Sequence, residues 1–274
     1  MTSLRVETLV IGDELLTGRI SDTNSTFVGD KLFQLGVVVQ RHTVIADVIE
    51  TIQEEMTLAS QPADVVIALG GRGPTPDDRT AAAVGKLLKC DLVDDVAAKE
   101  YLLKRLEKLG RAVTPQALKQ VKYPSAMKPI PNPVGAAAGF WGAIKDCEFF
   151  FLPGVPEEMM VMYSETVEPK IQSIGKTAPI HHDLWSCYAI WESELQRLLD
   201  PIEASLSKDS WIGYRTSPPD NHVTLYTKLK PGSPDHLKIT NAIDAVLKPH
   251  VFSRSETLEE LLLKLLAEKR ISVS

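Results

Sequence analysis

Hydrophobic and polar positions repeat in a strand-then-helix order through residues 5–172. Two further apolar runs, at residues 140–144 and 148–152, predict a hairpin that precedes a helix at 156–171. Continuous apolar strands that alternate with helices are typical of a mostly parallel sheet covered by helices on both faces. We therefore predict an α/β domain over residues 4–174. Its other predicted strands are 6–11, 37–44 and 64–69, and its other predicted helices are 23–35, 48–59, 76–88, 96–109 and 115–121.

A linker at residues 173–179 separates this domain from a region with a different pattern. That pattern predicts a small α+β domain over residues 178–252, of a kind that can resemble a KH fold. Residues 255–270 predict one more helix, and residues 271–274 have the character of a strand that begins. We expect residues 255–274 to be the start of a truncated further domain. The elements predicted in the second domain are strands at 180–190, 210–216 and 222–229 and helices at 193–204 and 235–246.

The composition is that of a globular protein, with 44% hydrophobic and 24% charged residues among 274. The formal net charge of −6 argues against a nucleic-acid partner, because nucleic-acid-binding proteins usually carry a basic face. The second domain also lacks the GXXG loop with which KH folds bind RNA. No signal-peptide pattern occurs, and no apolar run approaches the roughly 20 residues that span a bilayer. The sequence therefore predicts a cytoplasmic protein that binds neither nucleic acid nor membrane.

The glycine-rich segment from Gly70 to Thr80 lies between a predicted strand and a predicted helix. Ligands of open parallel sheets bind beyond the carboxyl ends of the strands, and glycines allow the backbone to approach them closely. The N–H groups at the start of the helix then offer an anion site. A purely structural interpretation makes Thr75 the N-cap, Pro76 the first helical residue and Asp78 the third. Three glycines and two adjacent acids favour a ligand site over a helix cap alone.

A second polar segment, from Gly12 to Gly18, also follows a predicted strand. Its Asp13 and Glu14 are expected at the same edge of the sheet as Asp77 and Asp78. Four carboxylates near one anion site would repel a phosphate unless a cation intervenes. Magnesium is held in this way by one or two carboxylates together with substrate oxygens. The sequence therefore predicts a metal-assisted phosphate site.

Three other positions leave a structural and a functional interpretation open. Asn24 either contacts the ligand or caps the following helix. Glu157 and Glu158 follow the Leu152–Gly154 turn at the start of a predicted helix, where the helix dipole favours acids. A structural role is therefore sufficient for at least one of these two glutamates.

Four motifs occur in a fixed order: GDELL with a following glycine at 12–18, GGxGPTxDDxT at 70–80, NPxG…GF at 132–140 and LPGVPxEM at 152–159. Their order and spacing resemble the N-terminal domain of the CinA family, within the wider molybdopterin-binding (MoaB/Mog-like) proteins. The resemblance covers residues 4–172. Residues 180–252 resemble the KH-like domain that follows in CinA proteins. Residues 256–274 resemble the opening of their deamidase domain, without its catalytic residues.

The resemblance implies hydrolysis of ADP-ribose to AMP and ribose 5-phosphate by a homodimer. It implies a divalent metal, Mg²⁺ or Co²⁺, and K⁺ as an optional further ion. The implied catalytic residues are Asp13, Asp77 and Asp78, and the implied metal ligands are Asp13, Glu14, Asp78 and Glu158. The implied contacts to the nucleotide substrate come from Gly12, Asn24, Gly70, Gly71, Arg72, Gly73, Pro74, Thr75, Asn132, Gly135, Pro153 and Gly154.

The chain departs from the family pattern at five positions. Arg72 stands where a small apolar residue is usual, and it is expected either to form a bidentate phosphate contact or to point into solvent. Ala136 and Ala138 replace a threonine and a proline, and Ala117 and Leu118 stand where many members have polar residues.

Two other functions remain open at this point. One is a molybdopterin-binding or adenylylating enzyme of molybdenum cofactor synthesis, although Asp77 stands where Mog-type members generally have arginine. The other is a catalytically weakened nucleotide-binding scaffold. The replaced polar positions favour the scaffold, and the retained Asp13, Asp77 and Asp78 argue against it.

Overall fold

The computed structural model describes residues 4–175, 178–217, 220–254, 256 and 258–269. The chain divides into two compact units, residues 1–177 and 178–274. The strand expected to begin at 271–274 lies outside the described residues. So do parts of the linker at 173–179 and of the turn between the predicted strands 210–216 and 222–229. Each unit is described by itself.

The first unit contains a six-stranded mixed sheet in the order β2-β1-β3-β8-β7-β6. The four strands from β2 to β8 are parallel, and β7 and β6 extend the sheet in antiparallel fashion. The predicted mostly parallel sheet is therefore confirmed. The strands are β1 (Val6–Ile11), β2 (Val39–Ile45), β3 (Val65–Leu69), β6 (Lys128–Ile130), β7 (Gly139–Ile144) and β8 (Cys147–Leu152).

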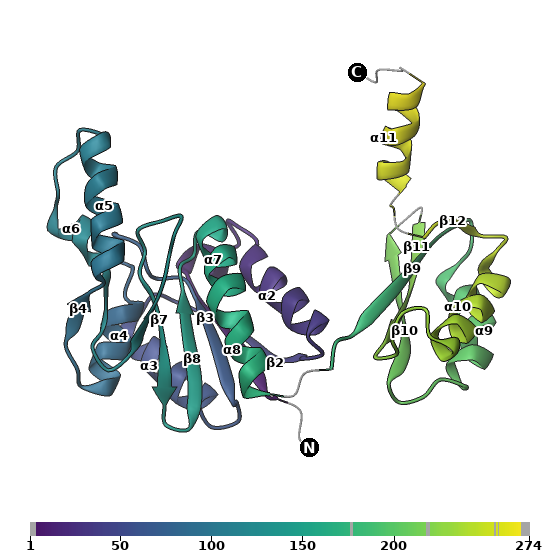
Figure 1. The fold of residues 1–274 in the computed structure, drawn as a ribbon, viewed down its shortest axis with the longest axis horizontal. Coiled ribbons are helices and arrows are strands. Elements are labelled where there is room, and N and C mark those ends of the chain that lie inside the picture. Colours follow the sequence, from purple (N-terminus) through teal and green to yellow (C-terminus); the bar gives the residue numbers. More distant parts are fainter. Residues whose placement is uncertain (1–3, 176–177, 218–219, 255, 257, 270–274) are drawn as a thin grey trace. The chain divides into compact units, whose positions relative to one another are not determined.

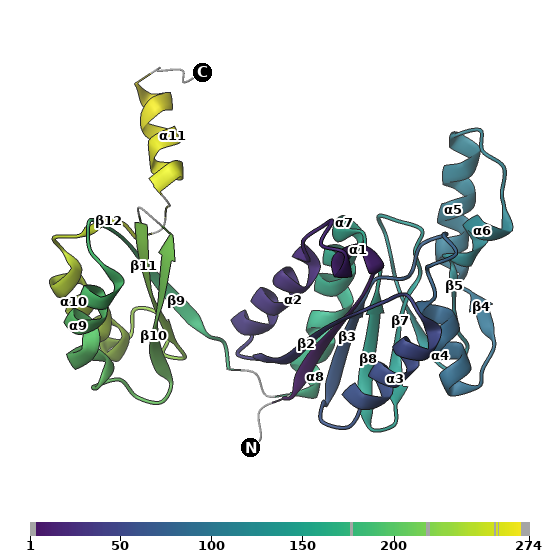
Figure 2. The same ribbon diagram turned by 180° about the vertical axis from the view of Figure 1, so that it is seen from behind.

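Helices cover both faces of this sheet (Figures 1 and 2). On one face α2 (Thr23–Gln34), α7 (Pro156–Met162) and α8 (Glu168–Ile174) pack on Val6, Val10 and Ile67. On the other face α3 (Ile49–Ala59) and α4 (Thr80–Leu88) pack on Leu9, Ile11 and Phe149. Residues of one strand thus enter two different cores, which explains why β3 is apolar along its whole length and why every residue of β1, even Glu7 and Thr8, is buried.

A small extension carries α5 (Val96–Lys108), α6 (Pro115–Lys119) and a two-stranded sheet of β4 (Leu92–Asp94) and β5 (Lys122–Pro124). Its core is a cluster in which Ala136 and Ala138 pack against α5, with Ala117 and Leu118 at its margin. Four of the five departures from the family pattern therefore lie in a hydrophobic core.

Two predicted helices differ from the observed ones. The helix expected at 76–88 begins only at Thr80, because the Asp78 carboxylate accepts the Thr75 N–H and hydroxyl at 2.8 and 2.5 Å. Such local side-chain bonds favour a turn over a helix, so the assignment of Thr75 as N-cap and Asp78 as third helical residue is wrong. The helix expected at 156–171 contains a π-helical turn at Tyr163–Val167, in which the Glu168 N–H donates to the Tyr163 carbonyl. Pro169 has no N–H with which to continue the α-helical pattern.

The second unit is a four-stranded antiparallel sheet in the order β10-β11-β9-β12, packed against two helices. The predicted α+β organisation is confirmed. Its core contains Trp185, Leu199, Leu225 and Ile243. No described helix is long and apolar enough to span a membrane. The elements are β9 (His181–Tyr188), α9 (Glu192–Glu203), β10 (Ser210–Ser217), β11 (Asp220–Thr227), α10 (Pro234–Leu247), β12 (Val251–Ser253) and α11 (Leu258–Glu268).

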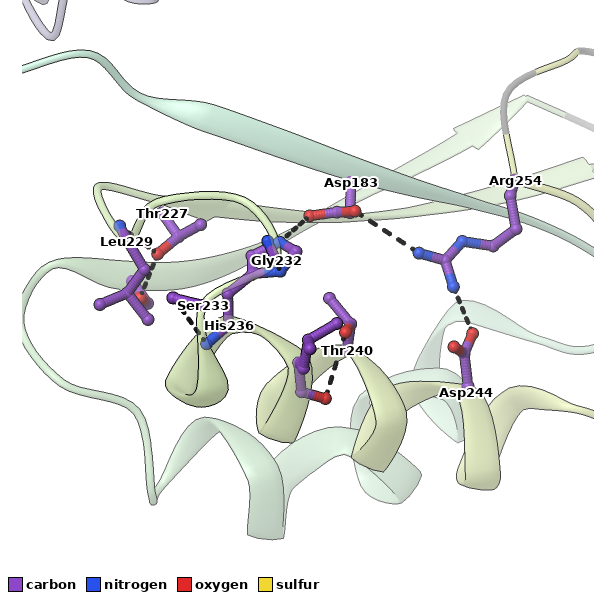
Figure 3. A network of polar contacts seen from close by, with 11 residues as sticks. Asp183, Thr227, Leu229, Gly232, Ser233, His236, Thr240, Asp244 and Arg254 are labelled. Carbon is purple, nitrogen blue, oxygen red and sulfur yellow. Dashed lines mark hydrogen bonds and ion pairs between the residues drawn. The ribbon is translucent and has the colours of Figure 1, made fainter.

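A polar network around Asp183 connects three segments of this unit (Figure 3). The Gly232 N–H donates to Nδ1 of His236 at 3.2 Å, so Nε2 carries the proton and donates to Asp183 at 2.8 Å. Arg254 lies 3.6 Å from the same carboxylate and also pairs with Asp244. Asp183 therefore ties β9 to α10 and to the segment after β12.

Replacing Asp183 tests this connection. We expect Asp183→Ala to lower the free energy of unfolding by about 1–3 kcal/mol, because the buried His236 donor loses its acceptor. The half-buried Asp209, 3.8 Å from Lys228, provides a matched control, and Asp209→Ala should cost less than about 1 kcal/mol. Urea-induced unfolding measures both values. Equal losses in the two variants would contradict a special role for Asp183.

Candidate active site

A cavity of about 410 Å³ lies where the parallel strands of the first unit end. Its walls come from the segments that follow β1, β2, β3 and β8, the usual location of ligands in open α/β sheets. The structure brings most of the predicted substrate-contacting and acidic residues into this wall. Those that line it are Gly12, Glu14, Asn24, Gly70, Gly71, Arg72, Gly73, Pro74, Thr75, Asp77, Asp78, Pro153, Gly154 and Glu158, whereas Asp13, Asn132 and Gly135 do not.

Neighbouring atoms and a left-handed backbone conformation leave room only for glycine at the first two positions after β3. Gly70 has φ +100° and Gly71 has φ +62°, a region that side chains rarely adopt. A Cβ on Gly70 would overlap the Ile11 carbonyl oxygen, and one on Gly71 would overlap the Thr80 hydroxyl. The Thr80 hydroxyl donates to the Gly70 carbonyl at 3.0 Å. The loop is therefore held against β1 and the start of α4.

Asp78 folds the second half of this loop into a turn. Its carboxylate accepts two bonds from Thr75 and lies against Gly73, where a Cβ would come within 2.6 Å of Oδ2. Lys119 at the end of α6 donates to the Thr75 carbonyl at 2.5 Å. The turn keeps Asp77 and Asp78 in the wall of the cavity.

Asn24 joins two sides of the cavity. Asp22, not Asn24, caps α2, because the Asp22 carboxylate accepts the Ser25 N–H at 2.9 Å. The capping interpretation of Asn24 is therefore wrong. Its Nδ2 donates to the Gly154 carbonyl at 2.8 Å, and its buried Oδ1 has no partner in the described part of the chain. A contact from Asn24 to a ligand stays a prediction.

Asn132 and Gly135 do not line the cavity, but both determine where Glu158 lies. The Asn132 side-chain amide donates to the Glu158 carboxylate at 2.6 Å and to the Ala137 carbonyl at 3.0 Å. A Cβ on Gly135 would overlap the Glu158 carboxylate. Glycine at 135 therefore makes room for an acid of the cavity.

Asp47 is a candidate functional residue that the sequence analysis missed. It follows β2 and lines the cavity with only 8% of its surface exposed. Its carboxylate accepts the Asp13 N–H at 3.1 Å, and its own N–H donates to the Asp13 carboxylate at 3.3 Å. Burial, together with the negative charges of Asp13, Glu14 and Asp77, raises the pKa of Asp47 to about 6. Its place directly after a strand next to β1 was the available signal.

The wall of the cavity is strongly acidic. Its acidic residues are Glu14, Asp22, Asp47, Asp77, Asp78 and Glu158, and Arg72 is the basic residue among the described lining. The structure does not gather the predicted metal ligands Asp13, Glu14, Asp78 and Glu158 into one group. Among the described residues, no three His, Cys, Asp or Glu side chains are placed to hold a metal ion together. Oxygen donors still suit a hard cation such as Mg²⁺, which needs only one or two carboxylates when ligand oxygens complete its shell.

Both expectations for Arg72 are wrong, because its guanidinium is buried and bonded to the protein. Only 3% of the residue is exposed. Nε donates to the Ala138 carbonyl at 2.9 Å, and Nη2 donates to the carbonyls of Lys122, at 2.7 Å, and Ala138. A guanidinium can bind a phosphate in bidentate fashion through Nε and Nη2 or through Nη1 and Nη2. Because Nη2 is already bonded to carbonyl groups, neither pair of nitrogens is open to a phosphate. The four other departures, at Ala117, Leu118, Ala136 and Ala138, do not line the cavity.

The sheet and its cavity define an α/β domain of the molybdopterin-binding type, and a family model described as "Probable molybdopterin binding domain" matches residues 7–173. A "CinA-like protein" of Geotalea daltonii is 38% identical over 199 residues, which cover 73% of this chain and 48% of that protein. A "CinA-like protein" of Anaeromyxobacter sp. (strain Fw109-5) is 34% identical over 260 residues, which cover 94% of this chain and 62% of that protein. The crystal structure of "the protein CinA with unknown function" from Thermoplasma acidophilum is 34% identical, with a TM-score of 0.54, and covers 61% of this chain and 98% of that one.

The chain belongs to the CinA family, and the resemblance predicted from its motifs is confirmed. It spans about half the length of the curated relatives it matches.

The raised pKa of Asp47 predicts a stabilising substitution. The folded-state pKa of about 6 exceeds the ordinary 3.8, so ionised Asp47 destabilises the fold above pH 6, and this cost disappears as the pH falls toward 3.8. In EDTA we expect Asp47→Asn to be more stable than the wild type at pH 8, by at most about 3 kcal/mol. The advantage should shrink at pH 5. Thermal unfolding at both pH values measures it.

Asp64 provides a control of opposite sign. A hydrogen bond from Arg5 lowers the pKa of Asp64, so its ionised form stabilises the fold above the ordinary pKa. Asp64→Asn should therefore lower the melting temperature at pH 8. The interpretation of Asp47 fails if both substitutions shift the melting temperature in the same direction.

Proposed function

We propose that the first unit is a metal-dependent hydrolase of a phosphoric anhydride, and that ADP-ribose is its substrate. The observation that carries the proposal is a single cavity that combines a glycine loop with six acidic residues. The loop allows a pyrophosphate to approach the backbone, and the acids suit a cation that neutralises it. A volume of about 410 Å³ falls in the range of small-molecule sites.

In the proposed reaction, water attacks one phosphorus of the pyrophosphate and the bridging P–O bond breaks. The two phosphates leave as AMP and ribose 5-phosphate, and a carboxylate of Asp77 or Asp78 accepts the proton of the water. A divalent cation, held by one or two of Glu14, Asp78 and Glu158, would neutralise charge on the phosphate oxygens. The Gly70–Gly73 backbone and the Asn24 side chain bind and orient the substrate.

The reaction is tested by incubating the protein with ADP-ribose and Mg²⁺ or Co²⁺ and separating the products by chromatography. We expect AMP and ribose 5-phosphate in equal amounts, and excess EDTA should abolish turnover because the cavity acids then repel the substrate. AMP release that persists unchanged in EDTA would remove the metal from the mechanism.

Asp78 is the acid whose substitution is most informative. Asp78→Asn should fold, with a loss of about 1 kcal/mol from weaker bonds to Thr75, and should reduce kcat by about 10²-fold or more. Asp95→Asn is the matched control, since Asp95 also accepts a backbone N–H, that of Ala98 at 3.0 Å, but does not line the cavity. Circular dichroism and steady-state kinetics measure the two effects. A loss of activity that only follows the folded fraction would make Asp78 a structural residue.

A second candidate function is the binding or adenylylation of a molybdopterin, which the match to the molybdopterin-binding family model favours. Aspartate at position 77, in place of the arginine of Mog-type motifs, argues for the hydrolase instead. The two functions give different products. An adenylylating enzyme would transfer AMP from a nucleoside triphosphate to a pterin with release of pyrophosphate, and it would release no ribose 5-phosphate from ADP-ribose.

A further inference from the structure

Arg72 connects three segments that surround the cavity. It belongs to the glycine loop after β3, and it donates to the Lys122 carbonyl of β5 and to the Ala138 carbonyl before β7. Its Cζ atom also lies 4.6 Å from the centroid of the Phe140 ring. One side chain therefore fixes the relative positions of the 70–73, 120–122 and 132–138 segments.

The last of these segments determines where Glu158 lies. Asn132 donates from one amide group to both the Ala137 carbonyl and the Glu158 carboxylate, at 3.0 and 2.6 Å. The Ala138 N–H donates to the Gln120 carbonyl at 2.8 Å, which holds the segment from its other side. A displacement at 137–138 would therefore reach Glu158 through Asn132.

The guanidinium carries a buried charge without an ion-pair partner among the described residues. Burial lowers the pKa of Arg72 to about 9, so the group stays protonated at neutral pH. A buried charge bonded only to carbonyl groups gives little net stability. Its five donors in a fixed planar arrangement do, however, set the positions of the acceptors around it.

We propose that Arg72 is a positioning residue that holds the 132–138 segment, and through Asn132 the Glu158 carboxylate, in place against the glycine loop. It touches no reacting atom. Its part in catalysis rests on the proposed function, but its part in ordering the segment does not.

Hydrogen–deuterium exchange of the ligand-free chain tests the ordering role. We expect Arg72→Leu to speed exchange in peptides covering 132–140 by about tenfold or more, because the segment loses its link to the glycine loop. Arg72→Lys keeps the charge but loses the fixed planar arrangement of donors, so its exchange should be intermediate. Arg79→Leu is the matched control: Arg79 is exposed, and among the described residues its side chain donates only to the Pro76 carbonyl of its own turn. Exchange in Arg72→Leu and Arg72→Lys equal to that of the wild type would overturn the proposal.

Steady-state kinetics with ADP-ribose test whether Arg72 positions a group needed for catalysis or only stabilises the fold. We expect Arg72→Leu to lower kcat by about tenfold or more while KM stays within about threefold, with partial recovery in Arg72→Lys. An active wild type whose kcat is unchanged in Arg72→Leu would overturn the positioning role. A wild type that releases no AMP would overturn the proposed function, and the exchange experiment would still decide whether Arg72 orders the segment.

Discussion

The close approach of Gly70 to β1 is the constraint on which the site depends. Its N–H donates to the Leu152 carbonyl of β8 at 3.0 Å, and its Cα lies against the Ile11 carbonyl of β1, where no side chain fits. A Cβ on Gly154 would lie 3.6 Å from the same Cα. The ends of β1, β3 and β8 therefore converge on one residue without a side chain. The cavity lies beyond these strand ends and is lined by the segments that follow them.

The sequence predicted the parallel core because β1 and β3 are buried on both faces, so β3 is apolar at every position and β1 is apolar except at Glu7 and Thr8. It also placed the glycine loop and the acids at the correct edge of the sheet, since the ends of parallel strands meet there. It failed where side chains compete with the backbone. Asp78 satisfies the Thr75 N–H and hydroxyl, so α4 begins at Thr80 and not at Pro76.

Asp47 and Arg72 were mispredicted because their roles depend on residues distant in the chain. Asp47 carries no motif, and its importance comes from the reciprocal bonds with Asp13, 34 positions away. Arg72 looks exposed because glycines flank it, yet its acceptors, the carbonyls of Lys122 and Ala138, lie 50 and 66 positions further along the chain. Local spacing contains no information about either contact.

The departures from the family pattern form one coordinated arrangement. Alanine at 138 has an N–H, which donates to the Gln120 carbonyl, and the proline usual in the family could not make this bond. The carbonyl of the same residue accepts from Arg72, the other unusual residue of the site. Ala136 and Ala138 pack with Ala98 and Leu102 outside the cavity. The departures at 72 and 138 therefore meet in the contacts that fix the 132–138 segment, and the acids of the cavity remain in its wall.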